Sequence, residues 1–215
     1  MRPLSIHEGR DNSLLPILIE IHSDVKDPKI LDCTYNTGKM WKDLYSFNPI
    51  RMDIDPRFGH DIVGSFDAIP LEDNSLDIII FDPPHLPTNA ASKNSSKIWK
   101  DTYGITESGE GREGDNISDM FLPFLKEAKR VLVDGGIVLA KIADIVHNHK
   151  YQWHHIHFIE TAWSLNMTAC DVVIKKDPNA GNLKSSKWEN VKHFRKCHCY
   201  WIVIRNGTRC EAKKK

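Results

Sequence analysis

The chain has 215 residues, of which 40% are hydrophobic, and its formal net charge at pH 7 is zero. This length and composition suit a single globular domain over residues 1–215. No apolar run reaches the roughly 18 residues that a transmembrane helix needs, and the first residues lack the apolar core of a secretory signal. We therefore expect a cytoplasmic protein without a membrane span.

Five cysteines are scattered along the sequence, and no Cys-x-x-Cys pair is present. Cys197 and Cys199 flank His198 inside an apolar run, which is typical of a strand rather than of a zinc site. The histidines between residues 147 and 157 place no ligand set on one helix face, so we interpret them as surface and packing residues. The sequence predicts free thiols in a reducing compartment and no bound metal.

Charge is distributed unevenly along the chain. Residues 175–215 contain 12 Lys and Arg but only 3 Asp and Glu, whereas the remainder contains 17 and 26. This asymmetry predicts a basic surface at one end of the molecule. A solvated tail has the same composition, and Lys213–Lys215 fits that simpler interpretation. The stretch from Lys175 to Lys196 lies between two predicted strands and is the better candidate for a functional surface.

Short apolar runs alternate with helical patterns, which is typical of a parallel α/β sheet with helices on both faces. In the first half we expect a helix over 13–22, a strand over 29–32, a short helix over 40–45, and strands over 50–54, 61–64 and 76–81. In the second half we expect a helix over 118–132 that ends at Gly135-Gly136, a strand over 137–142, a helix over 153–165, and final strands over 167–174 and 198–204. These elements make about seven strands in one domain.

The clearest strand, Leu76–Phe81, is followed at once by Asp82-Pro83-Pro84-His85. Its continuous apolar run indicates burial on both faces, at the centre of a parallel sheet. Prolines end a strand, and a plain strand terminator would explain the pair. A carboxylate at the carboxyl end of such a strand faces the crevice where open α/β sheets bind ligands, and rigid prolines can aim a carbonyl group there. The motif is therefore the strongest candidate for a catalytic centre.

Three acidic residues earlier in the chain follow predicted strands. Asp32 begins a turn that keeps only Gly38 of a glycine-rich nucleotide-binding loop. Asp53 lies 21 residues later, where doubly wound folds place the acid that holds a ribose diol, with Asp55 as the competing choice. Asp67 follows the weak third strand and could accept a hydrogen bond from an adenine amino group. Each acid alone fits a solvated turn, but their order and spacing favour a nucleotide-like cofactor.

From about residue 28 to 205, the chain resembles the class I S-adenosylmethionine-dependent methyltransferases, and among them the amino-methyltransferases with an [Asp/Asn/Ser]-Pro-Pro-[aromatic] motif. The resemblance implies a Rossmann-like, seven-stranded sheet that is mostly parallel and has a C-terminal antiparallel strand pair. The segment Lys129–Gly136 fits the start of the fifth strand in that family. The cofactor implied is S-adenosyl-L-methionine.

The resemblance also implies a role for each motif. The first-strand acid and the turn near Gly38 would hold the methionine part of the cofactor, the second-strand acid Asp53 the ribose, and the segment after the third strand the adenine. The cofactor residues are then Asp32, Cys33, Thr34, Thr37, Gly38, Asp53, Ile54, Phe66, Asp67, Ala68 and Asp82. The catalytic residues are Asp82, Pro83, Pro84 and His85.

The resemblance implies methyl transfer to an exocyclic amino group of a nucleic-acid base. Asp82 and the Pro83 carbonyl would each accept an amino hydrogen and direct the nitrogen lone pair at the cofactor methyl group. The base would be flipped out of a duplex and stacked on His85. The family usually has Tyr, Phe or Trp at that position, and it has glycines where this chain has the residues Cys33, Thr34, Tyr35 and Asn36. Adenine N6 in DNA is our first choice, and cytosine N4 or an RNA base the alternative.

Two loop insertions, at about 86–116 and 176–196, are candidates for nucleic-acid contact because they combine cationic and aromatic side chains. The first is polar and rich in Gly, Ser and Asn, and a mobile solvated loop is the alternative interpretation for both. Lys141 and Asp144, at the end of the fifth expected strand, could orient the target base or its phosphate, and a surface ion pair is an equal alternative. The predicted substrate contacts are Lys97, Trp99, Tyr103, Lys141, Lys184, Lys187, His193 and Arg195.

Two further classes of function stay open. A catalytically silent binding module would have no use for the carboxylate of Asp82 beside two prolines. A small-molecule methyltransferase would leave the basic segment over 175–196 unexplained. Nucleic acid, DNA before RNA, is therefore the predicted partner, and the sequence sets no oligomeric state.

Overall fold

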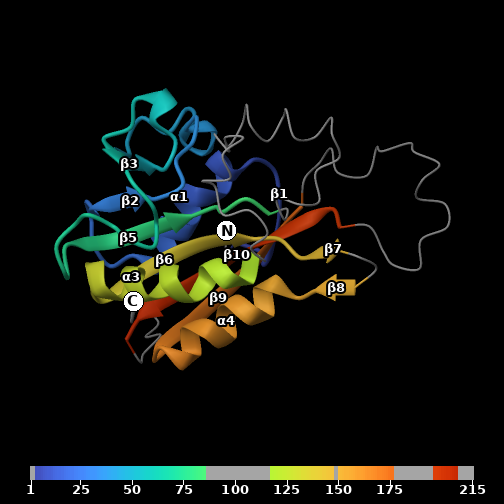
Figure 1. Ribbon diagram of the computed structural model, residues 1–215. Coiled ribbons are helices and arrows are strands. Elements are labelled where there is room, and N and C mark those ends of the chain that lie inside the picture. Colours follow the sequence, from blue (N-terminus) through green and yellow to red (C-terminus); the bar gives the residue numbers. More distant parts are fainter. Residues whose placement is uncertain (1–2, 86–116, 148–149, 177–195, 208–215) are drawn as a thin grey trace.

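The computed structural model describes residues 3–85, 117–147, 150–176 and 196–207 (Figure 1). The strands are β1 (Ile6–Glu8), β2 (Ile30–Asp32), β3 (Ile50–Asp53), β4 (Ile62–Val63), β5 (Leu76–Phe81), β6 (Leu132–Ile142), β7 (Ile145–His147), β8 (Lys150–Gln152), β9 (Met167–Lys176) and β10 (His198–Asn206). The helices are α1 (Asp11–His22), α3 (Phe121–Val131) and α4 (His154–Ser164), with 3-10 turns η1 (Lys39–Trp41), η2 (Pro56–Phe58) and η4 (Ile117–Met120).

Eight of these strands form one sheet in the order β1-β9-β10-β6-β5-β2-β3-β4, and β7 pairs with β8 in a separate hairpin. β10 runs antiparallel to β6 and β9, whereas the other neighbours in the sheet pair in parallel. The expected mostly parallel sheet with an antiparallel C-terminal pair is therefore confirmed. β2, β3, β5 and β6 all end at one edge, called the carboxyl edge below, where open α/β sheets bind ligands.

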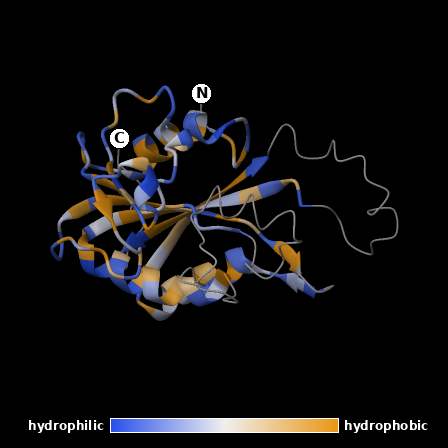
Figure 2. Ribbon diagram, turned by 45° about the horizontal axis from the view of Figure 1, so that its top comes forward, coloured by the Kyte–Doolittle hydropathy of each residue, from blue (hydrophilic) through white to orange (hydrophobic). Residues whose placement is uncertain are grey.

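Helices cover both faces of the sheet. α1 packs in a core that includes Ile78 and Ile80 of β5, and α3 and α4 pack in another core that includes Ile79 and Phe81. Neighbouring residues of β5 enter different cores because successive side chains of a strand point to opposite faces. The hydrophobic colouring along the central strands in Figure 2 matches this double burial, which the continuous apolar run predicted.

The central elements have nearly their expected bounds, but the prediction of a helix over 40–45 is wrong. Only the turn η1 forms there, and Asp43 has a positive φ of 68°, which interrupts a right-handed helix. A pattern of apolar side chains does not reveal such a local backbone conformation.

We expected the paired glycines 135 and 136 to end the preceding helix, but they do not. α3 ends at Val131, and β6 starts at Leu132, five residues before the expected strand. Gly135 has a φ of 78°, and a Cβ on Gly136 would lie 3.1 Å from the carbonyl oxygen of Asp77. The glycines therefore let β6 pass close to β5 where the register of the pair shifts.

Three short strands were not expected from the sequence. β1 adds an eighth strand to the sheet by pairing in parallel with β9, with Ile6 opposite Ile174. β7 and β8 form a hairpin directly after β6. Strands of three residues carry too little periodicity to be distinguished from loops.

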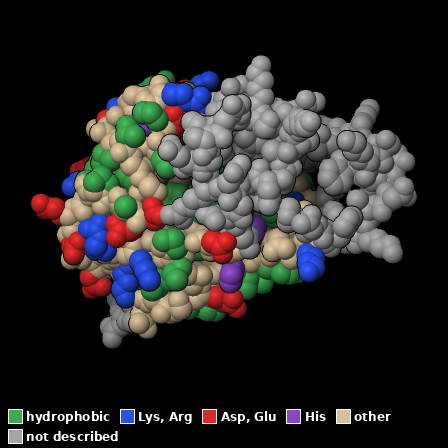
Figure 3. Space-filling view, in the orientation of Figure 1, with side chains coloured by type: hydrophobic (Ala, Val, Ile, Leu, Met, Phe, Trp, Pro, Cys, Tyr) green, Lys and Arg blue, Asp and Glu red, His purple; other side chains and the backbone are tan. Residues whose placement is uncertain are grey.

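Charged side chains of both signs are interspersed on the face that Figure 3 shows. Most of the basic stretch lies outside the described residues, so the predicted basic surface stays a prediction. No helix within the described ranges is long and apolar enough to cross a membrane.

The cysteines differ from our expectation in one respect. Cys33, Cys197 and Cys199 are free, whereas Cys170 is disulfide-bonded. The prediction of free thiols throughout is therefore wrong for Cys170. Scattered spacing gave no sign of this bond, because pairing depends on which strands and loops the fold brings together.

Candidate active site

The predicted motif and the predicted cofactor turn meet at the carboxyl edge. Asp82 follows β5, and its backbone N–H donates a hydrogen bond to Oγ1 of Thr34 at 2.8 Å. Thr34 belongs to the turn after β2, which is the parallel neighbour of β5. Two segments 48 residues apart in the sequence are thereby joined at one point.

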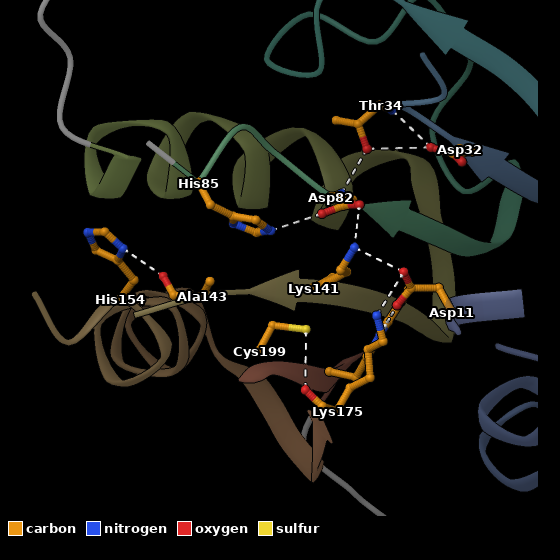
Figure 4. Close-up of polar contacts among 11 residues, drawn as sticks. Asp11, Asp32, Thr34, Asp82, His85, Lys141, Ala143, His154, Lys175 and Cys199 are labelled. Carbon is orange, nitrogen blue, oxygen red and sulfur yellow. Dashed lines mark hydrogen bonds and ion pairs between the residues drawn. The ribbon is translucent and has the colours of Figure 1, made fainter. Parts of the chain in front are cut away.

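The Asp82 carboxylate has a hydrogen-bond donor at each oxygen (Figure 4). Nε2 of His85 lies 3.1 Å from Oδ1, and Nζ of Lys141 lies 3.0 Å from Oδ2. Burial raises the pKa of Asp82, but the positive charge of Lys141 and the hydrogen bond from His85 outweigh it and lower the pKa to about 2. Asp82 is therefore ionised at neutral pH, although its side chain is only 24% exposed.

Lys141 is held by a second carboxylate. Its Nζ lies 3.1 Å from Oδ2 of Asp11, at the start of α1, and Lys175 donates to the same oxygen at 3.3 Å. The indole Nε1 of Trp201 donates to the other oxygen of Asp11 at 3.1 Å. Burial lowers the pKa of Lys141, but Asp82 and Asp11 outweigh it and raise the pKa above its ordinary value. The ammonium group is thus charged and fixed between two acids.

Two histidine nitrogens near this network have no hydrogen-bond partner in the described part of the chain. One is Nδ1 of His85, and the other is Nε2 of His154, whose side chain is almost fully buried. Nδ1 of His154 lies 3.0 Å from the Ala143 carbonyl oxygen, and this contact makes it the protonated nitrogen. Burial lowers the pKa of His154, so its Nε2 is a bare acceptor at neutral pH.

Asp32, at the end of β2, is buried, and both of its carboxylate oxygens accept hydrogen bonds from groups of the chain itself. Its Oδ2 accepts a hydrogen bond from the indole Nε1 of Trp41 at 2.7 Å, and its Oδ1 accepts one from the backbone N–H of Thr34 at 3.0 Å. Burial raises its pKa to about 7, because neither donor carries a charge. The arrangement ties the turn to the 3-10 turn η1.

The turn after β2 is compact despite having few glycines. Cys33 is buried, with its backbone N–H and thiol both bonded to the Ile80 carbonyl oxygen. Gly38 has a φ of 68°, and a Cβ there would lie 2.5 Å from the hydroxyl oxygen of Tyr35. The phenol of Tyr35 therefore occupies the space above the turn, and Gly38 is the position that permits it. Thr37, also a predicted cofactor residue, is exposed next to Gly38.

The structure distinguishes Asp53 from its competitor Asp55. Asp53 accepts hydrogen bonds from the backbone N–H groups of Asn36, at 2.7 Å, and of Asp55, at 3.0 Å. The carboxylate of Asp55 is bound by Arg57 through both oxygens, and this hydrogen bonding lowers its pKa. Asp53 keeps free lone pairs beside the turn and is the better candidate for a hydroxyl acceptor.

Apolar side chains lie beside these acids. Ile54, directly after Asp53, is 59% exposed. Phe66 packs edge-on against Phe81 of β5, with 5.3 Å between ring centroids, and is followed by the half-buried Asp67 and the exposed Ala68. An exposed aliphatic side chain next to a carboxylate fits a nucleoside, because the aliphatic group would cover the purine face and the carboxylate would accept a hydrogen bond from a sugar hydroxyl. The residues present therefore fit the adenosine part of S-adenosylmethionine.

Seven of the predicted substrate contacts lie outside the described residues: Lys97, Trp99, Tyr103, Lys184, Lys187, His193 and Arg195. The eighth, Lys141, lies inside and contacts Asp82 and Asp11 rather than solvent, since its side chain is only 17% exposed. Of the two open interpretations of Lys141, the ion pair is the one that the structure contains, but it is largely buried and in contact with the motif.

Sequence reasoning missed several residues of this site. Asp11 and Trp41 were not candidates, although they contact Lys141 and Asp32. Lys175 was considered only as the first residue of the basic stretch, whereas it contacts Asp11. Asp11 lies 130 residues from Lys141 in the sequence, so no local spacing could connect them. An acid at the first position of a helix has a ready local explanation in the helix dipole, which hides its role at the carboxyl edge.

No family profile matches the chain, and no curated protein matches it. Solved structures do match. An S-adenosylmethionine-dependent methyltransferase from Methanosarcina mazei is 12% identical, with a TM-score of 0.54 over 90% of this chain and 98% of the other. The 1,6-didemethyltoxoflavin-N1-methyltransferase of Burkholderia thailandensis, solved with S-adenosylhomocysteine, is 10% identical, with a TM-score of 0.54 over 93% and 77%.

A third match is a protein described as a DNA modification methylase from Thermus thermophilus. It is 14% identical, with a TM-score of 0.40, and the match covers 67% of this chain and 51% of the other. The chain thus spans about half the length of that protein. At these identities the likeness concerns the fold alone. The fold is that of the class I S-adenosylmethionine-dependent methyltransferases, and S-adenosylmethionine is the cofactor of that class.

Proposed function

We propose that this protein transfers a methyl group from S-adenosylmethionine to an exocyclic amino group of a nucleic-acid base, with adenine N6 in DNA as the first candidate. Cytosine N4 in DNA and an RNA base are the alternatives within the same chemistry. The proposal depends chiefly on one observation, which is the ionised carboxylate of Asp82 at the end of the central strand β5, beside two prolines and the turn after β2.

The amino nitrogen of adenine is a poor nucleophile because its lone pair is conjugated with the ring. An ionised Asp82 can accept one amino hydrogen, and the Pro83 carbonyl the other, which favours a tetrahedral nitrogen. Bound S-adenosylmethionine supplies the electrophilic methyl group. Positioning and fixed charge are then the main sources of rate acceleration, and no covalent nucleophile is required.

Lys141 and His85 keep Asp82 in the acceptor state. Both oxygens of Asp82 have a donor, but each oxygen retains a second lone pair for an amino hydrogen. The proton released after transfer would pass to this carboxylate or to the neighbouring imidazole. Lys141 thus acts on the substrate through Asp82, as a positioning residue.

His85 stands where the family has an aromatic residue. Its imidazole is planar and 26% exposed, so one face could stack on a base while Nε2 bonds to Asp82. A Tyr or Phe could stack but could not make that bond in the same way. The base would therefore be recognised by a ring that is also hydrogen-bonded to the catalytic carboxylate.

The cofactor would be held by the turn after β2 and by Asp53. Asp53 accepts from the ribose, Ile54 contacts the purine face, and Asp67 accepts from the adenine amino group. Asp32 supports this turn from beneath through Thr34 and Trp41. Contacts with the nucleic-acid backbone are assigned, as proposals, to the basic loop over 176–196.

Incubation with methyl-labelled S-adenosylmethionine and DNA, RNA or neither polymer tests this function. Label should enter a polymer with the wild-type protein and should be lost with Asp82→Ala, while cofactor binding, measured by calorimetry, survives. Asp73→Asn is the matched control, because Asp73 precedes the same strand at its opposite end and is 66% exposed. Label in neither polymer would overturn the nucleic-acid substrate. Normal transfer by Asp82→Ala would overturn the catalytic assignment.

A further inference from the structure

A group of aromatic side chains at the carboxyl edge has no part in the site described above. It contains Tyr151 of β8, Trp153 and His155 at the start of α4, and Tyr200 of β10, and it is called the aromatic platform below. Tyr200 lies opposite Ile142 in the sheet, and the next pair is Trp201 opposite Lys141. The platform therefore begins one residue pair from the lysine that contacts Asp82.

The four rings form a continuous row. Tyr151 and Trp153 are stacked, with 4.0 Å between centroids and 29° between planes. His155 and Tyr200 are stacked at 4.0 Å and 17°. Trp153 and His155 connect the two pairs, with their centroids 6.3 Å apart.

Asp144 fixes this row from below. Its side chain is 1% exposed, and it accepts hydrogen bonds from the Tyr151 hydroxyl at 3.2 Å and from Nδ1 of His155 at 2.7 Å. Burial and the Asp144 charge raise the pKa of Tyr151 above its usual range, so the phenol stays neutral. The rings are thus held in place before any ligand arrives, which reduces the entropy lost on binding.

The exposed parts of the platform are apolar or cationic. Trp153 is 55% exposed, although it is stacked on Tyr151. Nζ of Lys196 lies 3.7 Å from the centroid of the Tyr151 ring, and Lys150 is exposed on the same hairpin. Open aromatic faces beside ammonium groups are the features with which proteins bind single-stranded nucleic acid, where bases stack and phosphates meet cations.

We propose that the aromatic platform binds single-stranded nucleic acid, with an unpaired base stacked on Trp153 and phosphates near Lys196 and Lys150. The inference rests on the proposed function and deepens it, because it places the strand next to the target base on the Lys141 side of Asp82. An unpaired strand is required, since a base inside a duplex presents no open face to a ring. An acidic peptide would also meet the ammonium groups, but it lacks a flat face to stack on the exposed ring of Trp153.

Two tryptophans at opposite ends of α4 provide a matched test. Trp153 caps the helix at the carboxyl edge, and Trp163 lies in its last turn, with exposures of 55% and 58%. Fluorescence anisotropy with a labelled oligonucleotide of about 20 nucleotides, single-stranded or annealed to its complement, measures binding. Trp153→Ala should weaken binding of the single strand about tenfold, whereas Trp163→Ala should leave it unchanged. Trp153→Phe retains a stacking face and should recover most of the affinity.

The charge of the platform gives a second readout. Lys196→Ala should reduce the slope of log affinity against log salt by about 0.7, the value for one phosphate contact on a single strand. Equal affinities of Trp153→Ala and Trp163→Ala for the single strand would overturn the proposal. The same holds if the wild-type protein binds no single strand.

The failure of this inference differs from the failure of the proposed function. If label enters a nucleic acid but Trp153→Ala binds like Trp163→Ala, the platform is wrong and the function stands. If Trp153→Ala specifically loses single-strand binding but no polymer is ever methylated, the platform stands and the function is wrong. Cofactor binding by both variants, measured by calorimetry, should equal that of the wild type.

Discussion

Asp32 and Asp82 end neighbouring strands at the same edge of the sheet, yet their acid–base behaviour is opposite. Burial raises the pKa of Asp32 to about 7, whereas Lys141 and His85 overcome burial and lower that of Asp82 to about 2. Asp32 has only uncharged donors, the Trp41 indole and the Thr34 backbone. The ammonium group of Lys141 thus keeps Asp82 anionic, whereas the uncharged indole of Trp41 leaves Asp32 with a raised pKa and a structural role.

The largest expected effect concerns Asp32 and stability. Its folded-state pKa of about 7 exceeds the ordinary value of 3.8, so the folded state binds this proton more tightly than the unfolded state. The contribution is fully present below about pH 4 and is lost as pH rises through about 7, a change of about 4 kcal/mol over roughly three pKa units. Asp32→Asn should remove this loss, as urea unfolding across that range would measure.

Asp73→Asn provides the background slope for that experiment, because Asp73 is exposed at the other end of the sheet. If the unfolding free energies of wild type and Asp32→Asn ran parallel from about pH 4 to about pH 7, Asp32 would be ionised throughout. The contrast with Asp82 would then be lost.

Removing the cation should make Asp82 resemble Asp32. In Lys141→Met, burial is no longer offset by the ammonium group, so the pKa of Asp82 rises and the carboxylate is partly protonated near neutral pH. We expect methyl transfer to fall about a hundredfold at neutral pH, or about 2.7 kcal/mol. The rate should recover partly as pH rises, whereas the wild type should show no titration of Asp82 above about pH 4.

Lys126→Met is the matched control for this substitution, since Lys126 is exposed on α3. The measurement is kcat/KM across the pH range with cofactor affinity determined in parallel. An unchanged rate and pH profile in Lys141→Met would show that the ion pair does not set the state of Asp82.

A smaller effect is expected at His85, which supplies the second donor to Asp82. His85→Phe restores the usual aromatic residue but removes the hydrogen bond, and we expect a loss of about fivefold in kcat, or about 1 kcal/mol. His85→Asn keeps a donor but loses the ring, so it should affect KM for the nucleic acid more than kcat. If both variants changed KM alone and equally, His85 would serve neither role.

The sequence predicted the centre of the molecule better than its rim. β5 was delimited correctly because a strand buried on both faces is a continuous apolar run, and its position placed Asp82 at the carboxyl edge. β1 and the β7–β8 hairpin were missed because three residues on an edge or a surface carry no such pattern. The proximity of Thr34 and Asp82 could be predicted, because both residues follow strands that are neighbours in such a sheet.

The electrostatic partners could not be predicted in the same way. Lys141 was a candidate from its position near the end of the strand that became β6, but its contact with Asp11 depends on how α1 packs against the sheet. Likewise, Trp41 reaches Asp32 only because η1 forms in place of a longer helix. Side chains that decide the pKa values thus come from tertiary packing, which has no local sequence signal.

The most direct test of the account is the identity of the methylated nucleoside. DNA treated with the protein and S-adenosylmethionine would be digested and its nucleosides analysed by mass spectrometry, for the wild type and for Asp82→Asn, which keeps the shape but not the charge. We expect N6-methyldeoxyadenosine with the wild type and none with Asp82→Asn. A methyl group on a ring carbon or on the sugar, or equal product from Asp82→Asn, would contradict it.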